Sequence, residues 1–181
     1  MSFKINLIFI FVLLFQSTLF AAIQSQSYAT NLKMREDRRV GVGLNAGGSL
    51  GALGTQIELN IEDADGAVIG FGAGSGFNTF QLLWKHSMAG FFINPYWKGG
   101  VSYWYKSDQE MKYLNSTISF NELKPERSES AALITGSLGV QYNQLSGVLS
   151  GSSFFLEISL LSNIAIRTIV PTGSIGALFY F

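Results

Sequence analysis

The chain has no cysteine, a single histidine and only three prolines among its 181 residues. Without cysteine it can form no disulfide, use no thiolate nucleophile and bind no metal through sulfur. Attachment to a membrane through an acylated cysteine is excluded for the same reason. If the chain is exported, it must therefore fold and remain stable without covalent cross-links.

Charge is scarce and balanced, with 12 basic and 12 acidic residues making up 13% of the chain. This is about half the share that is usual in soluble domains. The chain has no basic surplus with which to attract a phosphate backbone, so we expect no nucleic-acid partner. Aromatic residues reach 14% and glycines number 20, which is an unusual balance for a cytosolic enzyme.

The first residues have the pattern of an export signal. Lys4 supplies a short positive region, Ile5 to Phe15 is apolar except for Asn6, and small residues follow at Ala21 and Ala22. The apolar run is shorter than the roughly 20 residues that a membrane-spanning helix requires. We therefore predict that residues 1–22 are a removed signal peptide, with an uncleaved membrane anchor as the alternative.

The stretch from 23 to 39 is polar and ends in a cluster of charged residues. Six charges fall between Asn31 and Arg39. Such a composition is typical of a segment that stays in water. We therefore expect a solvated periplasmic tail that leads into the first strand.

Beyond Arg39 the hydrophobic pattern has a period of two, which is typical of β-strands. From Thr55 to Glu62 every second residue is apolar, and the residues between them are polar. Turn sequences rich in Gly, Asp and Ser separate the segments of this kind. The pattern predicts eight strands, namely 40–47, 55–62, 67–73, 77–85, a fifth running to about Lys106 and beginning near Pro95, 131–142, a seventh between the turn Asn143–Ser152 and the connection Asn163–Pro171, and 172–181.

An even number of strands in an up-and-down barrel places both termini on the same side. One connection is long and polar: Lys106 to Glu129 holds nine of the 24 charged residues, and it leaves the fifth strand on the side opposite the termini. Short turns on one side and a long charged loop on the other are typical of outer-membrane barrels. We therefore predict an all-β domain over 40–181, an eight-stranded antiparallel transmembrane barrel with a long extracellular loop over 106–130.

Alternation alone does not say which face points inward, because a soluble lipocalin-like barrel would bury the apolar face. Glu58, Lys98 and Glu157 lie near the middle of their strands on the polar face. Charges at this depth would be costly against hydrocarbon but could neutralise one another inside a barrel. We therefore predict that these three residues form an ion and hydrogen-bond network in the barrel interior.

Aromatic residues on the proposed outer face gather near the strand ends, as expected where a barrel crosses two membrane surfaces. The predicted girdle comprises Trp84, Trp97, Tyr142, Phe154 and Phe181 on the termini's side, and Tyr103 and Tyr105 on the other.

The last segment places Ile175, Ala177, Phe179 and Phe181 on one face and ends on an aromatic residue. Together with the signal peptide and the eight alternating segments, this ending resembles the small OmpA/OmpX-type outer-membrane β-barrel family. The resemblance implies a bacterial outer-membrane location, contact with outer-membrane lipids, and recognition of the four terminal residues by the barrel-assembly machinery. The connections around 48–53 and 74–76 are shorter than family members often carry, which argues against a broad surface made of several loops.

The sequence offers little for catalysis. His86 and Ser87 are the residue types that outer-membrane lipid hydrolases use, but they are adjacent in a segment that we predict as a solvated turn. The sequence shows no spaced metal-binding cluster, phosphate-binding loop or carboxylate pair for glycoside hydrolysis. We expect neither a metal nor a cofactor.

Three functions follow from this pattern. The first is a non-enzymatic outer-membrane barrel with a structural or surface-interaction role through the 106–129 loop, which could contact a surface ligand. The second is a narrow pore or small-ligand carrier, because interior glycines on the first and third strands could leave a cavity. The third is a lipid-modifying enzyme that acts through His86 and Ser87.

Overall fold

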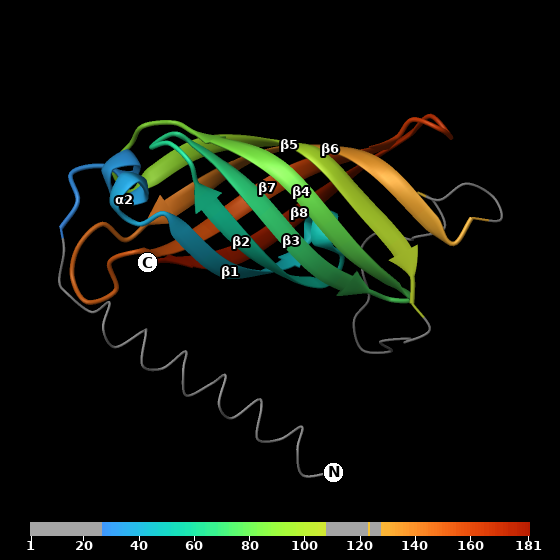
Figure 1. Cartoon of the computed structure of the whole chain (residues 1–181), viewed down its shortest axis with the longest axis horizontal. Helices are drawn as coiled ribbons and strands as arrows, with labels where there is room; N and C mark the ends of the chain where they lie inside the picture. Colours follow the sequence, from blue (N-terminus) through green and yellow to red (C-terminus); the bar gives the residue numbers. More distant parts are fainter. Residues whose placement is uncertain (1–26, 108–122, 124–127) are drawn as a thin grey trace, which may run out of the picture.

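The protein is a closed barrel of eight antiparallel strands. The computed structural model describes residues 27–107, 123 and 128–181. Each strand pairs with the next in sequence, and β8 closes the barrel on β1, so the predicted up-and-down topology is confirmed. Figure 1 shows the strands slanting across the barrel, with α2 and the C-terminus at the same end. We call this end the terminal end and the opposite one the far end.

The elements follow the predicted order, with differences at their boundaries. They are α2 (Asn31–Asp37), β1 (Val40–Gly47), the 3-10 turn η1 (Gly48–Leu50), β2 (Leu53–Asn60), β3 (Asp65–Gly74), β4 (Phe77–Ser87), β5 (Ile93–Lys106), β6 (Ser130–Asn143), β7 (Ser152–Asn163) and β8 (Thr168–Tyr180). The turn predicted at His86 begins later, because β4 continues to Ser87 and pairs with β5 up to Tyr96. The connection predicted to run to Pro171 is also shorter, since β8 begins at Thr168.

Two prolines lie in strands where one neighbour is missing. Pro95 pairs with Val140 of β6, but the β4 ladder reaches only as far as Tyr96. Pro171 pairs with Leu160 of β7, whereas β1 reaches only to Ser174. Proline has no N–H to donate, so strand positions with a free edge tolerate it. We expected Pro95 at the beginning of its strand or in a bulge, and it is the third residue of β5.

The interior of the barrel is polar and the exterior is apolar. Along β7, Ser153, Glu157 and Ser159 are buried, while Phe154 and Ile158 expose 59% and 67% of their surface on the other face. A soluble barrel would have the reverse arrangement, so the apolar face is the face of a transmembrane barrel toward lipid. None of the helices in the described ranges combines the length and apolar character needed to cross a membrane.

The seven residues of the predicted aromatic girdle all lie on the outer face. They expose between 39% and 59% of their surface, and they are Trp84, Trp97, Tyr103, Tyr105, Tyr142, Phe154 and Phe181. Outer-face positions near the strand ends suit rings that are apolar but carry a polar edge.

The β1–β2 connection folds into the far end of the barrel. Leu50 of η1 is fully buried, and the inward-facing glycines Gly54, Gly70 and Gly72 leave the space that it occupies. The rings of Phe77 and Trp104 stack with their centroids 4.5 Å apart, and Leu123 packs with them in one buried cluster. The glycine-rich bend predicted here is therefore an inward plug that fills this end of the lumen.

Gly72 allows the plug to sit against the barrel wall. A Cβ atom at this position would lie 2.0 Å from the Leu50 carbonyl oxygen, a backbone atom that cannot move without displacing η1. We expect Gly72→Ala to lower the free energy of unfolding by about 1–3 kcal/mol, as overpacking does. Gly136→Ala is the matched control, because nothing lies within 4 Å of that Cβ position. Urea titrations of both variants in phospholipid vesicles test this, and equal midpoints would contradict it.

Candidate functional site

The terminal end of the barrel is closed by the N-terminal segment that was predicted to be a solvated tail. That prediction is wrong for residues 27–39, because Tyr28, Met34, Arg35 and Arg38 are buried. Thr30 caps α2 by accepting a hydrogen bond from the Lys33 backbone N–H at 3.2 Å. Charged side chains remain exposed on the outer side of the helix, where the Lys33 ammonium pairs with Glu36 at 2.9 Å and Asp37 at 3.2 Å.

The segment is fixed to the rim by hydrogen bonds with two turns. Asn31 binds the β4–β5 turn through its side chain, donating to Met88 O at 3.0 Å and accepting from Gly90 N at 2.9 Å. Tyr28 N donates to Leu145 O of the β6–β7 turn at 2.9 Å. The segment thus spans the barrel mouth and contacts turns on strands far apart in sequence.

Arg38 ties the end of the segment to the last strand. Its Nη1 donates to both Ser150 O and Tyr180 O at 2.8 Å, and its Nε donates to the Tyr28 hydroxyl at 3.0 Å. The neighbouring contact between Phe181 N and Val40 O, at 2.9 Å, continues the closure of β8 on β1. The N-terminal segment and the C-terminal strand are therefore held as one unit.

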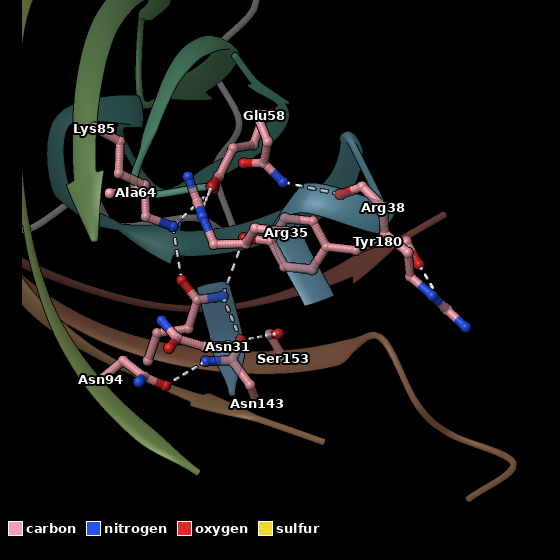
Figure 2. Close-up of polar contacts among 12 residues, drawn as sticks. Asn31, Arg35, Arg38, Glu58, Ala64, Lys85, Asn94, Asn143, Ser153 and Tyr180 are labelled. Carbon is pink, nitrogen blue, oxygen red and sulfur yellow. Dashed lines mark hydrogen bonds and ion pairs between the residues drawn. The ribbon is translucent and has the colours of Figure 1, made fainter. Parts of the chain in front are cut away.

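Arg35 points from α2 into the barrel (Figure 2). Its guanidinium forms an ion pair with the Glu58 carboxylate, and its Nε donates to Asp63 O at 2.9 Å. Lys85 Nζ donates to the other Glu58 oxygen at 2.8 Å, so one buried carboxylate is shared by two cations. Burial lowers the pKa of the Arg35 guanidinium, but the Glu58 carboxylate and Tyr180 together outweigh this effect, and the pKa lies above its ordinary value.

A second ion pair lies deeper in the lumen. Lys98 Nζ is 2.5 Å from Glu157 Oε2, and that carboxylate also accepts from the Tyr96 hydroxyl at 2.8 Å and from Ser159 Oγ at 3.0 Å. The Tyr96 ring lies within reach of both lysines, 4.6 Å from Lys85 Nζ and 5.4 Å from Lys98 Nζ. Cations at such distances are attracted to the face of an aromatic ring.

The three residues predicted for an interior network are all buried inside the barrel. Lys98 pairs with Glu157, whereas Glu58 pairs with Arg35 and Lys85. Our sequence reasoning missed both of these partners. Lys85 could have been predicted from the alternation of its strand. The apolar residues Leu82 and Trp84 take the outer face, so Lys85 falls on the inner face.

Amides continue the network from Lys85 to the closing strand. Lys85 Nζ donates to Gln141 Oε1 at 2.6 Å, and Gln141 Nε2 donates to the Tyr180 hydroxyl at 3.0 Å and to Asn143 Oδ1 at 2.9 Å. Asn143 Nδ2 donates to Asn94 Oδ1 at 2.7 Å (Figure 2). These contacts link polar side chains of four strands, β4, β5, β6 and β8, which suits a rigid closure.

His86 and Ser87 do not form a pair. They are consecutive residues of β4, so Ser87 is buried on the inner face while His86 lies on the outer face. His86 Nδ1 is 3.0 Å from Asp65 Oδ1, and the same oxygen accepts from Trp84 Nε1 at 2.8 Å. The expectation of a solvated turn histidine is therefore wrong, and a catalytic His86–Ser87 pair has no geometric basis. The described ranges contain no group of three or more His, Asp or Glu residues suited to a metal ion.

Neighbouring atoms fill the space beside the glycines of β1 and β3, so these glycines leave no cavity. Cβ atoms at Gly41 and Gly43 would lie 2.7 Å from the Tyr180 ring and 2.2 Å from the Ala177 carbonyl oxygen, respectively. At Gly70 the nearest atoms belong to Gln81, at 2.8 Å. A groove of about 490 Å³ does exist, but it is open and lies on the outer wall over Gly136, between Trp97, Leu138, Ile158 and Leu160.

Together these features define an eight-stranded membrane β-barrel whose lumen is closed by its own chain. No protein-family profile and no curated protein sequence matches the chain. Solved structures do match. The N-terminal β-barrel domain of Pseudomonas aeruginosa OprF is 10% identical over 87% of this chain and 100% of its own, with a TM-score of 0.54. Yersinia pestis outer membrane protein Ail is 10% identical over 80% and 99%, with a TM-score of 0.45, and the outer membrane enzyme PagL is 13% identical over 77% and 97%, with a TM-score of 0.40. The predicted resemblance to small OmpA/OmpX-type barrels is confirmed at the level of the fold.

Proposed function

We propose that the protein is a non-enzymatic barrel of the bacterial outer membrane that does not conduct and has a structural or surface-interaction role. The observation that carries this proposal is the filling of the lumen from both ends. Arg35 and its ion pairs occupy the terminal end, and Leu50 with Phe77 and Trp104 occupies the far end. Eight strands enclose little more space than their own side chains need, so we expect these two closures to block a continuous water path.

The proposed outer-membrane location is supported by the apolar exterior around a polar interior and by the predicted signal peptide over 1–22, which lies outside the described residues. In this setting the lipid-facing wall contacts outer-membrane lipids. Ile175 and Phe181 are exposed on the outer face of the barrel, as a recognition element for the assembly machinery would need to be. Ala177 and Phe179 are half-buried on the same face of β8.

The surface role falls to the predicted extracellular loop, most of which lies outside the described residues. Its two ends are held together at the far end, where Lys106 N donates to Glu129 O at 2.8 Å. Leu123 is fully buried against the Phe77–Trp104 cluster, and its carbonyl accepts from Asn163 Nδ2 at 2.7 Å. A loop tied down at its ends and at Leu123 can present the rest of 106–129 to a surface ligand.

Conductance separates this proposal from a pore or carrier. The purified protein, refolded in detergent and added to planar phospholipid bilayers, should give no stable current steps, whereas a general porin in the same bilayers should give them. Reproducible single-channel steps from this protein would show that the two closures do not seal the lumen and would favour the pore.

A further inference from the structure

Two turns at the terminal end carry large apolar side chains that nothing in the described chain covers. They are the β4–β5 turn, residues 88–92, and the β6–β7 turn, residues 144–151, which we call the apolar turns. Met88, Phe91, Phe92, Val148 and Leu149 expose between 49% and 70% of their surface. Side chains of this size gathered on turns that end in water would be unfavourable and mark a contact surface.

The third turn of the same rim has the opposite character. Residues 61–65 carry Glu62, Asp63 and Asp65, and Arg39 Nη1 donates to Ile61 O beside them at 3.1 Å. Around the apolar turns the sequence has no Lys, Arg, Asp or Glu from 86 to 97 or from 138 to 156. The mouth of the barrel therefore has a charged half and an apolar half.

The N-terminal segment does not cover the exposed apolar side chains of the apolar half. It contacts both apolar turns at their backbone groups, namely Met88 O, Gly90, Leu145 O and, through the buried Arg38 guanidinium, Ser150 O. The buried Leu145 packs with Tyr28 and Met34, but Phe91, Phe92, Val148 and Leu149 remain outside this cluster. The segment fixes the shape of the turns and leaves their apolar side chains pointing away from the lumen.

The exposed side chains continue the lipid-facing wall without a break. The ring of Phe92 stacks on that of Tyr142 at 6.3 Å, and Tyr142 belongs to the aromatic girdle. Tyr142 is the strand partner of Ile93 on one side and of Phe154 on the other, and both are exposed on the outer face. A surface that is continuous with the lipid contact and carries no charge is suited to lipid.

We propose that the apolar turns insert into the interfacial layer of the lipid leaflet at the terminal end, so that the barrel lies deeper in the membrane on its β5–β7 side than at its charged turn. This inference rests on the proposed membrane location. The partner is the acyl and glycerol region of phospholipids. The charged turn at 61–65 stays in water on the opposite side of the mouth.

The absence of cysteine makes a direct test possible, because each introduced cysteine is unique. Phe91→Cys and Val148→Cys place an environment-sensitive fluorophore on the two apolar turns. Glu62→Cys is the matched control on the charged turn, and Leu138→Cys is the control on the lipid-facing wall. Each labelled protein is refolded into dioleoylphosphatidylcholine vesicles, and its quenching by doxyl-labelled phosphatidylcholine is compared with its quenching by iodide.

We expect labels at 91 and 148 to be quenched severalfold more strongly by doxyl lipid than the label at 62, and to be shielded from iodide. Iodide quenching equal to that at 62 would overturn the proposal. Shielding that appears only in native membranes would also overturn the proposal and would indicate a protein partner. Shielding that depends on protein density would overturn it as well and would indicate a second copy of this chain. If the label at 138 is not quenched by doxyl lipid either, the membrane barrel itself is wrong. The label at 138 therefore distinguishes failure of this proposal from failure of the proposed membrane location.

Discussion

Replacing Glu58 with glutamine should lower the free energy of unfolding by about 3–5 kcal/mol, the range expected when a buried ion pair loses one partner. Glu58 is fully buried and neutralises both Arg35 and Lys85. Among the described residues, the buried charged side chains comprise four cations (Arg35, Arg38, Lys85 and Lys98) and two carboxylates (Glu58 and Glu157), so the interior has no spare negative charge. Urea titration of the barrel in phospholipid vesicles at neutral pH measures the loss.

Two further variants make this result specific. Glu62→Gln makes the same chemical change on the exposed turn that follows β2, and it should shift stability by no more than about 0.5 kcal/mol. Glu58→Gln combined with Lys85→Met removes one of the two orphaned cations and should recover part of the loss. If Glu58→Gln unfolds at the same urea concentration as the wild type, the ion pairs do not hold the closure together.

A lysine at Ile158 should destabilise the folded barrel by about 2–4 kcal/mol in vesicles, the cost of a cation at the middle of a lipid-facing barrel wall. Ile158 lies near the centre of β7 and exposes 67% of its surface on the outer face. The loss follows from the lipid environment, because an exposed lysine on a soluble protein is nearly neutral for stability. Unfolding titrations in the same vesicles provide the measurement.

Ile61→Lys is the control for depth. Ile61 is also exposed, but it lies at the charged turn of the rim, where a lysine should cost only about 0–1 kcal/mol. Equal effects at the two positions would show that the wall around Ile158 does not face hydrocarbon. That outcome would restore the soluble barrel as an alternative.

The strands could be predicted from the sequence because each one lies between two different solvents. A strand with lipid on one side and a polar lumen on the other must alternate, and the part of β2 from Thr55 to Asn60 does so almost without exception, although the predicted strand ran on to Glu62 and the structure ends it at Asn60. The boundaries were less predictable. Nothing local distinguishes Thr168 as the start of β8, because the residues up to Gly173 pair with β7 alone and extend beyond the barrel's closed section.

The closure of the mouth could not be predicted from local pattern. A segment with the charges of Lys33 to Arg39 is typical of a solvated tail, and only the tertiary structure supplies Glu58 as the partner of Arg35. The pairing of Lys98 with Glu157 likewise depends on register, because the two residues lie on β5 and β7 with β6 between them. The polar face and mid-strand position of these charges were enough to predict that they lie inside the barrel. Their partners depend on the register between strands, which the sequence does not show.

The most direct test of a transmembrane barrel is the migration of the detergent-extracted membrane fraction on a gel with and without boiling. A transmembrane barrel should be recovered with the outer membrane, and its folded form should migrate differently until it is boiled. Recovery in the soluble periplasm, with no shift on boiling, would contradict it.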